Sequence, residues 1–259
     1  MCLGGIDMSD MIRIQDLENN PTARVPICLC LDTSDSMLAV EGECVQTGKT
    51  VFRDGKMWNI VTGGTTRLEE LQKGIELFYK AIREDEIAVY SAEICIVAFN
   101  NKAKCILDFA NIERQNHVPE LEASGDTHMG EGVNLALDLL EKRKKEYQDA
   151  GVDYYQPWLV LMTDGEPNGN VAELEKAITR TVSMTNDKKL TIFPIGIGEE
   201  ADMNVLNRFS PKRKALRLKE MKFGAFFEWL SQSVARTSQS MPGENVVLDV
   251  AGIESWGTL

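Results

Sequence analysis

The sequence predicts an α/β fold: a doubly wound, mainly parallel sheet with one antiparallel edge strand and helices on both faces. Apolar runs of strand length alternate along the chain with segments whose apolar residues recur at helical spacing. Such alternation is typical of a parallel sheet covered by crossover helices, and nearly continuous apolar runs are typical of strands buried on both faces. With 259 residues, of which 43% are apolar, the chain can form one domain with a substantial core.

The chain divides into three stretches, of which the middle one is the expected domain. Residues 1–24 are mixed and polar, and the turn signal Asn19-Asn20-Pro21 makes them an N-terminal lead-in. Residues 25–240 carry the strand and helix patterns, with a hairpin-like insertion at 38–65. Residues 241–259 form an acidic C-terminal tail.

The first strand is predicted over Val25–Leu31, with Cys28 and Cys30 on one face because side chains alternate along a strand. The helix expected soon after this strand is delayed by the insertion. It begins at Thr66-Arg67-Leu68-Glu69, which is a capping-box pattern. Apolar residues then recur at intervals of three and four, at Leu68, Leu71, Ile75, Phe78 and Ile82.

The remaining elements continue the alternation. The sequence predicts a strand over 93–99, an antiparallel edge strand over 104–109, a helix over 130–147, a strand over 158–162, a helix over 171–186, a strand over 190–197, a short helix over 202–209 and a helix over 223–235. The charged run at 141–146 is expected to be solvated surface, because such runs usually cover an exposed helix face.

Composition excludes several classes of partner. The formal net charge of −12 disfavours nucleic acid and anionic membranes, since both attract basic surfaces. The six cysteines include no C-x-x-C pair, and several lie in apolar runs where they resemble small core residues, so we expect a reduced, cytoplasmic environment. No stretch has the pattern of an export signal or the apolar length of a membrane span.

Oxygen-bearing side chains follow three separate segments. Asp32-Thr33-Ser34-Asp35-Ser36-Met37 comes directly after the first strand, Thr127 precedes the helix over 130–147, and Asp164 follows the strand over 158–162. Ligands of open parallel sheets collect at the carboxyl ends of the strands, so these residues can share one site. Carboxylates and hydroxyls are ligands that small divalent cations prefer. Taken alone, the motif at Asp32 more often begins a helix N-cap, and the Thr163-Asp164-Gly165 loop is common turn chemistry.

Taken together, these motifs resemble the von Willebrand factor A (VWA) domain family, a Rossmann-like fold whose metal-ion-dependent adhesion site (MIDAS) uses such residues in this order. Within the family the sequence looks most like the bacterial TerY-type proteins of tellurite-resistance and stress-response operons. The stretches that carry the resemblance are Val25–Met37, Leu161-Met162-Thr163-Asp164-Gly165-Glu166-Pro167, the Phe209-Ser210-Pro211 motif with its basic continuation to Leu218, and Phe226–Ser231.

The resemblance implies a set of metal ligands. Ser34, Ser36 and Thr127 would bind the cation through their hydroxyls. Asp32 and Asp164 would hold it directly or through water. Mg²⁺ is the expected ion, with Mn²⁺ or Ca²⁺ as alternatives, and a protein partner would supply an acidic side chain to its vacant position. Asp35 stands where relatives often have Gly, and we expect its side chain to face solvent.

These observations leave competing functions. The first is a metal-dependent protein-binding module, without catalytic residues, in a bacterial tellurite-resistance or stress-response system. The alternative is a Mg²⁺-dependent phosphotransfer enzyme or receiver with Asp32 as the nucleophile. Such a site needs a positive group over the transferred oxygens. No lysine follows the strand over 93–99 in a suitable place except Lys102 and Lys104, which belong to the edge hairpin. A structural subunit with a vestigial site is the third. His128, beside Thr127, is expected to be a loop side chain at the rim.

The insertion at 38–65 departs from the family pattern. Cys44–Phe52 and Met57–Val61, joined by Arg53-Asp54-Gly55-Lys56, predict a hairpin with an Asp-Gly turn. Its apolar residues are too many for a solvated linker. Two interpretations remain open: a flap beside the metal that contributes to partner choice, or a hairpin that folds back onto the domain and fills a groove.

Overall fold

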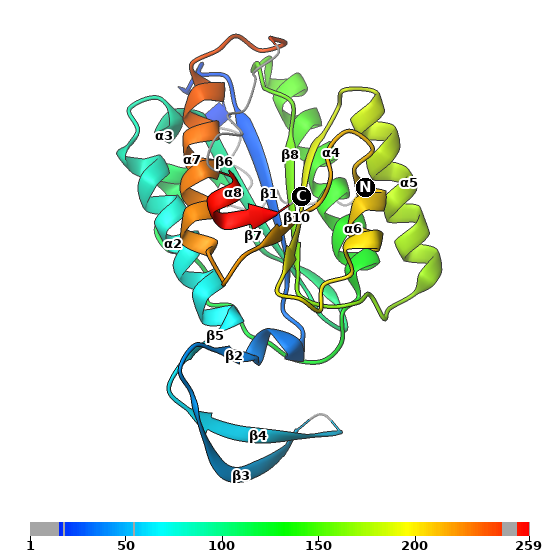
Figure 1. Ribbon diagram of the computed structural model, residues 1–259. Helices are drawn as coiled ribbons and strands as arrows, with labels where there is room; N and C mark the ends of the chain where they lie inside the picture. Colours follow the sequence, from blue (N-terminus) through cyan, green and yellow to red (C-terminus); the bar gives the residue numbers. More distant parts are fainter. Residues whose placement is uncertain (1–15, 18, 54, 245–252, 259) are drawn as a thin grey trace, which may run out of the picture.

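The computed structural model describes residues 16–17, 19–53, 55–244 and 253–258, and its centre is a seven-stranded sheet (Figure 1). The strand order is β11-β10-β9-β8-β1-β6-β7. The strands are β1 (Val25–Asp32), β6 (Ala92–Phe99), β7 (Ala103–Asn111), β8 (Trp158–Thr163), β9 (Thr191–Ile197), β10 (Leu216–Leu218) and β11 (Gly257–Thr258).

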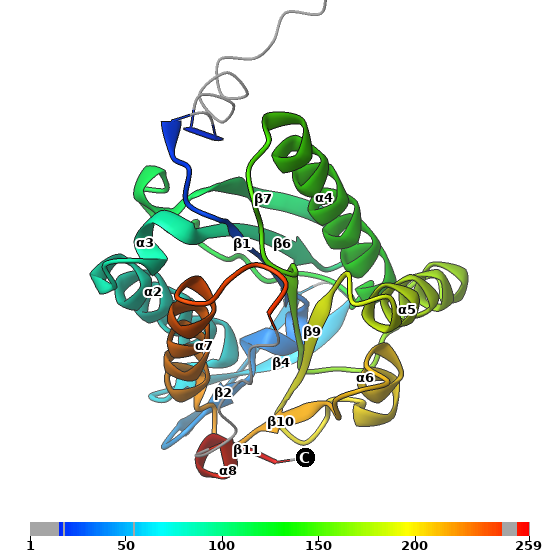
Figure 2. The same cartoon turned by 90° about the horizontal axis from the view of Figure 1, so that it is seen from above.

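Helices cover both faces of this sheet (Figure 2). The helices are α2 (Arg67–Glu84), α3 (Ala88–Ser91), α4 (Met129–Ala150), α5 (Val171–Asn186), α6 (Met203–Phe209), α7 (Phe223–Ser238) and α8 (Ile253–Trp256), with short 3₁₀ turns η1 (Asp35–Leu38) and η2 (Ile112–Arg114). Helices α2 and α7 lie on one face, and α4, α5 and α6 on the other. The predicted fold class is therefore confirmed.

The alternating side chains of β1 divide the core into its two halves. Ile27 and Leu29 pack under α2 and α7, whereas Cys28 and Cys30 pack under α4, so the two cysteines do share a face as predicted. Helix α2 begins with the predicted capping box, in which Thr66 and Glu69 bond reciprocally to each other's backbone amides. Its five predicted apolar positions are all buried.

The central position of β1 determines where a site can form. Strand β1 pairs in parallel with β6 on one side and with β8 on the other, so the chain changes direction across the sheet at β1. Open α/β sheets bind ligands at such a point, beyond the carboxyl ends of the strands. Strand β7 is the predicted antiparallel edge, and at the opposite edge β11, from the predicted tail, adds a second short antiparallel pair with β10.

The insertion contains the predicted hairpin. Strands β2 (Val40–Glu41) and β5 (Thr65–Thr66) pair at its base, and β3 (Val45–Arg53) pairs with β4 (Lys56–Thr62) beyond them. In Figure 1 the β3–β4 hairpin extends past the carboxyl edge of the central sheet. The interpretation in which its apolar residues fill a groove of the domain is wrong, because most of them are exposed.

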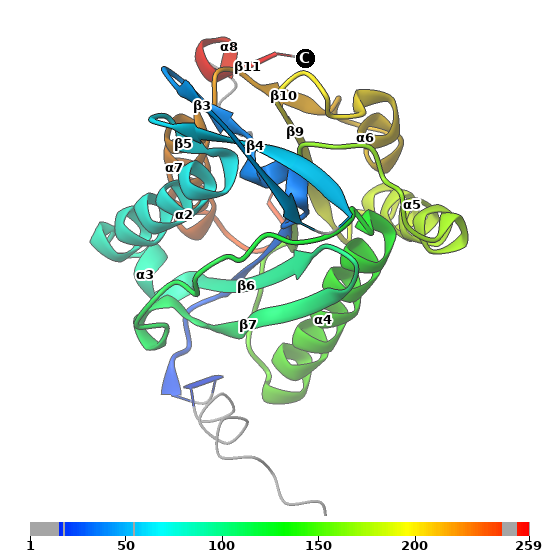
Figure 3. The ribbon, with the colours of Figure 1, turned by 90° about the horizontal axis from the view of Figure 1, so that it is seen from below.

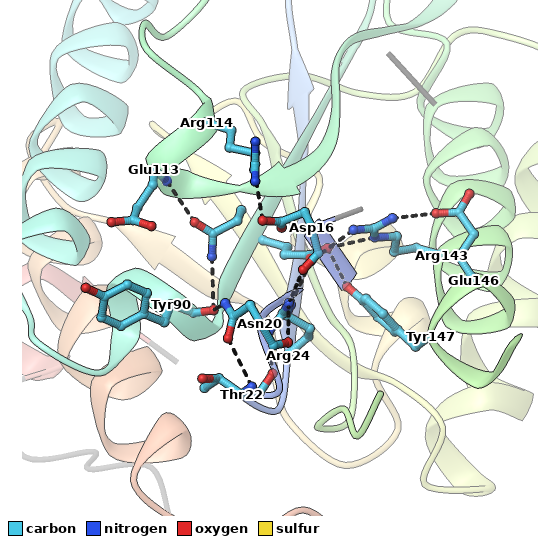
Figure 4. Close-up of polar contacts among 12 residues, drawn as sticks. Asp16, Asn20, Thr22, Arg24, Tyr90, Glu113, Arg114, Arg143, Glu146 and Tyr147 are labelled. Carbon is cyan, nitrogen blue, oxygen red and sulfur yellow. Dashed lines mark hydrogen bonds and ion pairs between the residues drawn. The ribbon is translucent and has the colours of Figure 1, made fainter. Parts of the chain in front are cut away.

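A buried cluster of charged groups lies at the opposite, amino edge of the sheet (Figure 4). The Glu93 carboxylate, at the start of β6, accepts hydrogen bonds from Arg24 Nε at 3.1 Å and from Arg143 Nε at 2.7 Å. Tyr147 Oη also donates to it, at 2.7 Å. Arg24 reaches back to backbone carbonyls of Asp16 and Asn20, which fastens the described part of the lead-in to the domain.

This cluster corrects the expectation that residues 141–146 are all solvated. Arg143 is only 1% exposed and belongs to the face of α4 that contacts the sheet. A buried guanidinium needs a partner, because desolvating an unpaired charge costs several kcal/mol. Glu93 and Glu146 provide that partner, so Arg143 is an internal ion-pair residue.

Other predictions fall partly outside the described residues. Most of the lead-in, residues 1–15 and 18, and residues 245–252 of the tail lie there. In the part of the chain that the structure describes, no helix is long and apolar enough to cross a membrane.

Candidate metal centre

Strand β1 ends in a fully buried carboxylate, that of Asp32. Asp32 Oδ1 accepts a hydrogen bond from the backbone N–H of Ser34 at 2.8 Å, and Oδ2 accepts one from Thr163 Oγ1 at 2.5 Å. Thr33 is bound to the carbonyl of Phe99 through its backbone and its hydroxyl, which joins the loop to the end of β6. Both Asp32 oxygens are thereby fixed in orientation before any ligand binds.

The two serines and the second predicted aspartate form a continuous chain of oxygens. Ser34 Oγ lies 2.9 Å from Ser36 Oγ, and Ser36 Oγ donates to Asp164 Oδ1 at 2.6 Å. Turn η1 supplies the curvature that brings Ser36 back toward the end of β8. Two residues that are 128 positions apart in sequence therefore share one hydrogen bond.

Thr127 joins the same place from the loop before α4. It is buried, and its backbone N–H donates to Asn168 Oδ1 at 2.7 Å. A Cβ placed on Gly165 would lie 3.6 Å from Thr127 Oγ1 and 3.8 Å from Ser36 Oγ, so both hydroxyls lie close to one point beside Gly165. The structure thus brings all five predicted ligand residues to the carboxyl edge of β1 and β8.

Arg67 is a site residue that the sequence interpretation missed. At the start of α2, its Nη1 donates to Asp164 Oδ2 at 2.8 Å and to Glu200 at 3.1 Å, and its Nε donates to Glu41 of β2 at 2.9 Å. The guanidinium itself is largely buried. The positive charge on Arg67 therefore neutralises part of the acidic site and connects it to the base of the insertion.

Asp35 also differs from expectation. Its side chain was expected to face solvent, and this is wrong: Asp35 is only 4% exposed. Its Oδ1 is fully enclosed and has no hydrogen-bond partner among the described residues. An enclosed carboxylate oxygen without a donor is costly, so Asp35 places an unsatisfied polar atom next to the serine loop.

The electrostatics of this cluster suit a bound cation. Burial, and then the nearby Asp164 carboxylate, together raise the pKa of Asp32 from 3.8 to about 7, although its hydrogen bonds lower it. Both effects penalise a buried negative charge that a cation would relieve. The donors are carboxylate and hydroxyl oxygens, which are hard ligands of the type that Mg²⁺, Mn²⁺ and Ca²⁺ take. The residues present therefore fit a divalent cation.

Comparison with known families tests what this arrangement resembles. The model of the von Willebrand factor type A domain matches residues 27–228. The chain belongs to the von Willebrand factor type A domain family. Domains of this VWA family often carry a metal site, mediate protein–protein interaction and are in general not catalytic. Comparison with curated proteins found no match.

Solved structures support the VWA fold. A von Willebrand factor type A protein from Catenulispora acidiphila superposes with a TM-score of 0.57 at 14% identity, over 83% of this chain and 43% of that one. The PilB minor pilin from Streptococcus sanguinis gives 0.54 at 14% identity, over 85% and 64%. The SpaC pilus adhesin from Lactobacillus rhamnosus GG gives 0.58 at 11%, over 83% and 31%. This chain spans less than two thirds of each, and the likeness shows the fold alone.

The geometry gives little support to phosphotransfer at Asp32. A carboxylate nucleophile must reach its substrate, but Asp32 is fully buried and both of its oxygens accept internal hydrogen bonds. Lys102 and Lys104 are exposed residues at the turn and start of β7. The guanidinium of Arg67 lies at this site, and it bonds to Asp164 rather than to Asp32.

A second group of metal-binding residue types lies on β6 and β7. Cys95 Sγ is 3.9 Å from Cys105 Sγ, with Asp108 nearby. The hydrogen bond with Cys95, followed by burial, raises the pKa of Cys105. A protonated thiol is a poor metal ligand, since the thiolate is the binding form. Cys95 is buried in the core beneath α4 and Cys105 packs against it, as their apolar sequence context predicted.

Proposed function

We propose that this VWA domain is a metal-dependent protein-binding module in which Asp32, Ser34, Ser36, Thr127 and Asp164 form a MIDAS. The observation that carries the proposal is the continuous oxygen cluster from Ser34 to Asp164, closed by Thr127 and built at the switch point of the sheet. Mg²⁺ is the proposed ion, because all of the donors are hard oxygens.

The hydroxyl and carboxylate side chains would have different roles in such a site. Ser34, Ser36 and Thr127 offer neutral hydroxyls, so they would hold a cation without neutralising its charge. Thr163 and the Ser34 amide fix the Asp32 carboxylate, and Arg67 fixes Asp164. When bound, the ion supplies a Lewis-acidic position that accepts an oxygen ligand from outside the chain. A carboxylate of a protein partner is the ligand that fits, since the ion keeps part of its positive charge.

The wider role proposed here follows the TerY-type sequence resemblance: a non-enzymatic module of a bacterial tellurite-resistance or stress-response system, acting in the cytoplasm. Composition supports a protein partner, because a net charge of −12 repels nucleic acid and anionic membranes. The cysteines in the described part of the chain are free thiols, and Cys28, Cys30 and Cys95 among them are buried, which supports a reducing compartment.

Partner capture from the source cell tests the proposal. Immobilised wild-type protein is compared in Mg²⁺ and in EDTA, alongside Thr127→Ala and the matched exposed control Thr179→Ala on α5. We expect a partner that is retained by wild type and by Thr179→Ala in Mg²⁺ and is lost in EDTA or with Thr127→Ala. A complex that is indifferent to both EDTA and Thr127→Ala would contradict a metal-dependent interface.

A further inference from the structure

The β3–β4 hairpin exposes large apolar side chains next to the proposed MIDAS. Phe52 is 67% exposed, Met57 63% and Val45 69%. In the strand register Phe52 lies opposite Met57, and Val51, which is 47% exposed, lies opposite Trp58. Opposite residues share a face and neighbours along a strand alternate, so each face of the hairpin carries exposed apolar side chains, although Trp58 is half-buried.

The hairpin also has two open strand edges. Among the described residues β3 and β4 form a sheet of their own, with no third strand on either side. An isolated two-stranded hairpin is only marginally stable in water. Large exposed apolar patches and unpaired strand edges are both features that bind other chains. This combination is therefore suited to an added strand from another protein.

The charge of the β3–β4 hairpin indicates what kind of partner segment it would attract. Within 45–62 the sequence has the basic residues Lys49, Arg53 and Lys56 against the single acidic residue Asp54. The segment is therefore net positive on a chain whose net charge is −12. Like charges repel across an interface, so an acidic segment is drawn to the hairpin and repelled by the rest of the domain.

The hairpin is continuous with the metal site at its base. Strand β5 leads directly into Arg67, and Glu41 of β2 bonds to Arg67 Nε, while Arg67 Nη1 bonds to Asp164. Viewed from the carboxyl side of the sheet, the hairpin lies in front of the end of β1 (Figure 3). One extended partner segment can therefore contact both places.

We propose that the β3–β4 hairpin is the second half of the partner-binding surface, and that its occupant is an extended segment rich in acidic and apolar residues, added as a third strand. The segment belongs to the same protein that supplies the metal-binding carboxylate, so this inference rests on the proposed function. Backbone hydrogen bonds along the open edge give affinity, apolar side chains cover those of Phe52 and Met57, and acidic side chains match the basic hairpin.

A phage-displayed library of random twelve-residue peptides is the probe, selected on the full chain in Mg²⁺. Selected peptides are then measured against Phe52→Ser with Met57→Ser, against Lys49→Glu with Lys56→Glu, and against the control Leu77→Ser with Val171→Ser. The control residues are equally apolar and are 54% and 70% exposed on α2 and α5. Circular dichroism establishes that each variant keeps the fold.

We expect selected peptides enriched in Asp, Glu and apolar residues that bind the control like wild type and both hairpin variants at least tenfold more weakly. N-methylation of alternate peptide amides should abolish binding at one set of alternating positions only, as strand addition requires. Peptides that bind hairpin variants and wild type equally, or a library that yields no binder, would overturn the inference. Repeating the measurements in EDTA separates the two claims: binding that needs the hairpin but not the ion contradicts the MIDAS proposal alone.

Discussion

Glu93→Gln removes the single negative charge at the centre of the buried cluster without changing the size of the side chain. In the wild type this carboxylate accepts four hydrogen bonds: one from Arg24, two from Arg143 and one from Tyr147. Burial, and then the Glu93 carboxylate, raise the pKa of Tyr147, so its hydroxyl stays protonated and donates. The amide that replaces the carboxylate keeps one accepting oxygen and turns an N–H₂ donor toward other donors.

The loss of unfolding free energy in Glu93→Gln depends on which hydrogen-bond partners Arg24 and Arg143 keep. Breaking a buried ion pair by removing one partner costs about 3 to 5 kcal/mol. Arg24 keeps its backbone carbonyl partners, and Arg143 keeps Glu146, whose side chain is 27% exposed. These remaining partners place Glu93→Gln near the lower end, about 3 kcal/mol of unfolding free energy. For a chain of this size that corresponds to a fall in Tm of about 6 to 12 °C.

Differential scanning calorimetry measures this, with urea unfolding as a second measure of the free energy. Glu84→Gln is the matched control, because the Glu84 side chain is 67% exposed and pairs only at 3.9 Å with Lys80. The control should change stability by less than about 0.5 kcal/mol. A Glu93→Gln variant that melts within 2 °C of wild type, roughly the effect of less than 1 kcal/mol, would refute the account of Arg143 as an internal ion-pair residue.

The remaining predictions concern the site. Arg67→Gln removes a positive charge beside Asp164, so calorimetric titration should show Mg²⁺ binding that is about three- to tenfold tighter. Lys73→Gln removes an exposed positive charge six residues further along α2 and should leave Mg²⁺ affinity unchanged. Weaker Mg²⁺ binding by Arg67→Gln would contradict this charge argument. In EDTA, the folded state holds a proton on Asp32 between the unfolded pKa of 3.8 and about 7. The unfolded state binds fewer protons there, so stability should fall as pH rises through this range and Asp32→Asn should flatten the fall; a rise with pH in wild type would contradict the buried-charge argument. Replacing residues 44–62 with a short Gly-Ser linker keeps Glu41 as the partner of Arg67. It should preserve metal affinity and Tm but abolish partner binding, since β3 and β4 form a separate sheet. Early melting with retained partner binding would make the insertion structural.

The fold was predictable because its signals are local and repeated. The run Val25–Leu31 is apolar throughout. The helix after Thr66 is indicated by its capping box and by the regular spacing of its apolar residues. Two-residue strands such as β2, β5 and β11 carry no period, so only tertiary pairing reveals them. Arg143 had a weak signal: it stands three positions after Leu140 and four before Tyr147, both buried, which is the spacing of one helix face.

The site was predictable in part for the same reason. Its five proposed ligands lie in loops at strand ends or helix starts, where position in an α/β fold implies convergence. Arg67 gave no such signal, because an arginine in the first turn of a helix is usually solvated, and its partners Asp164 and Glu200 are 97 and 133 positions away. The burial of Asp35 depends on how η1 folds against its surroundings, which a six-residue motif does not encode.

The most direct test of the central claim is a calorimetric titration of the metal-free protein with Mg²⁺. Wild type should bind one ion and gain thermal stability, because a ligand held only by the folded state shifts the folding equilibrium. Asp32→Ala with Asp164→Ala should abolish binding, Ser36→Ala should weaken it, and the exposed control Asp149→Ala with Asp187→Ala should match wild type. Mg²⁺ binding by Asp32→Ala with Asp164→Ala as tight as in wild type, or its absence in wild type, would contradict the assignment of this site.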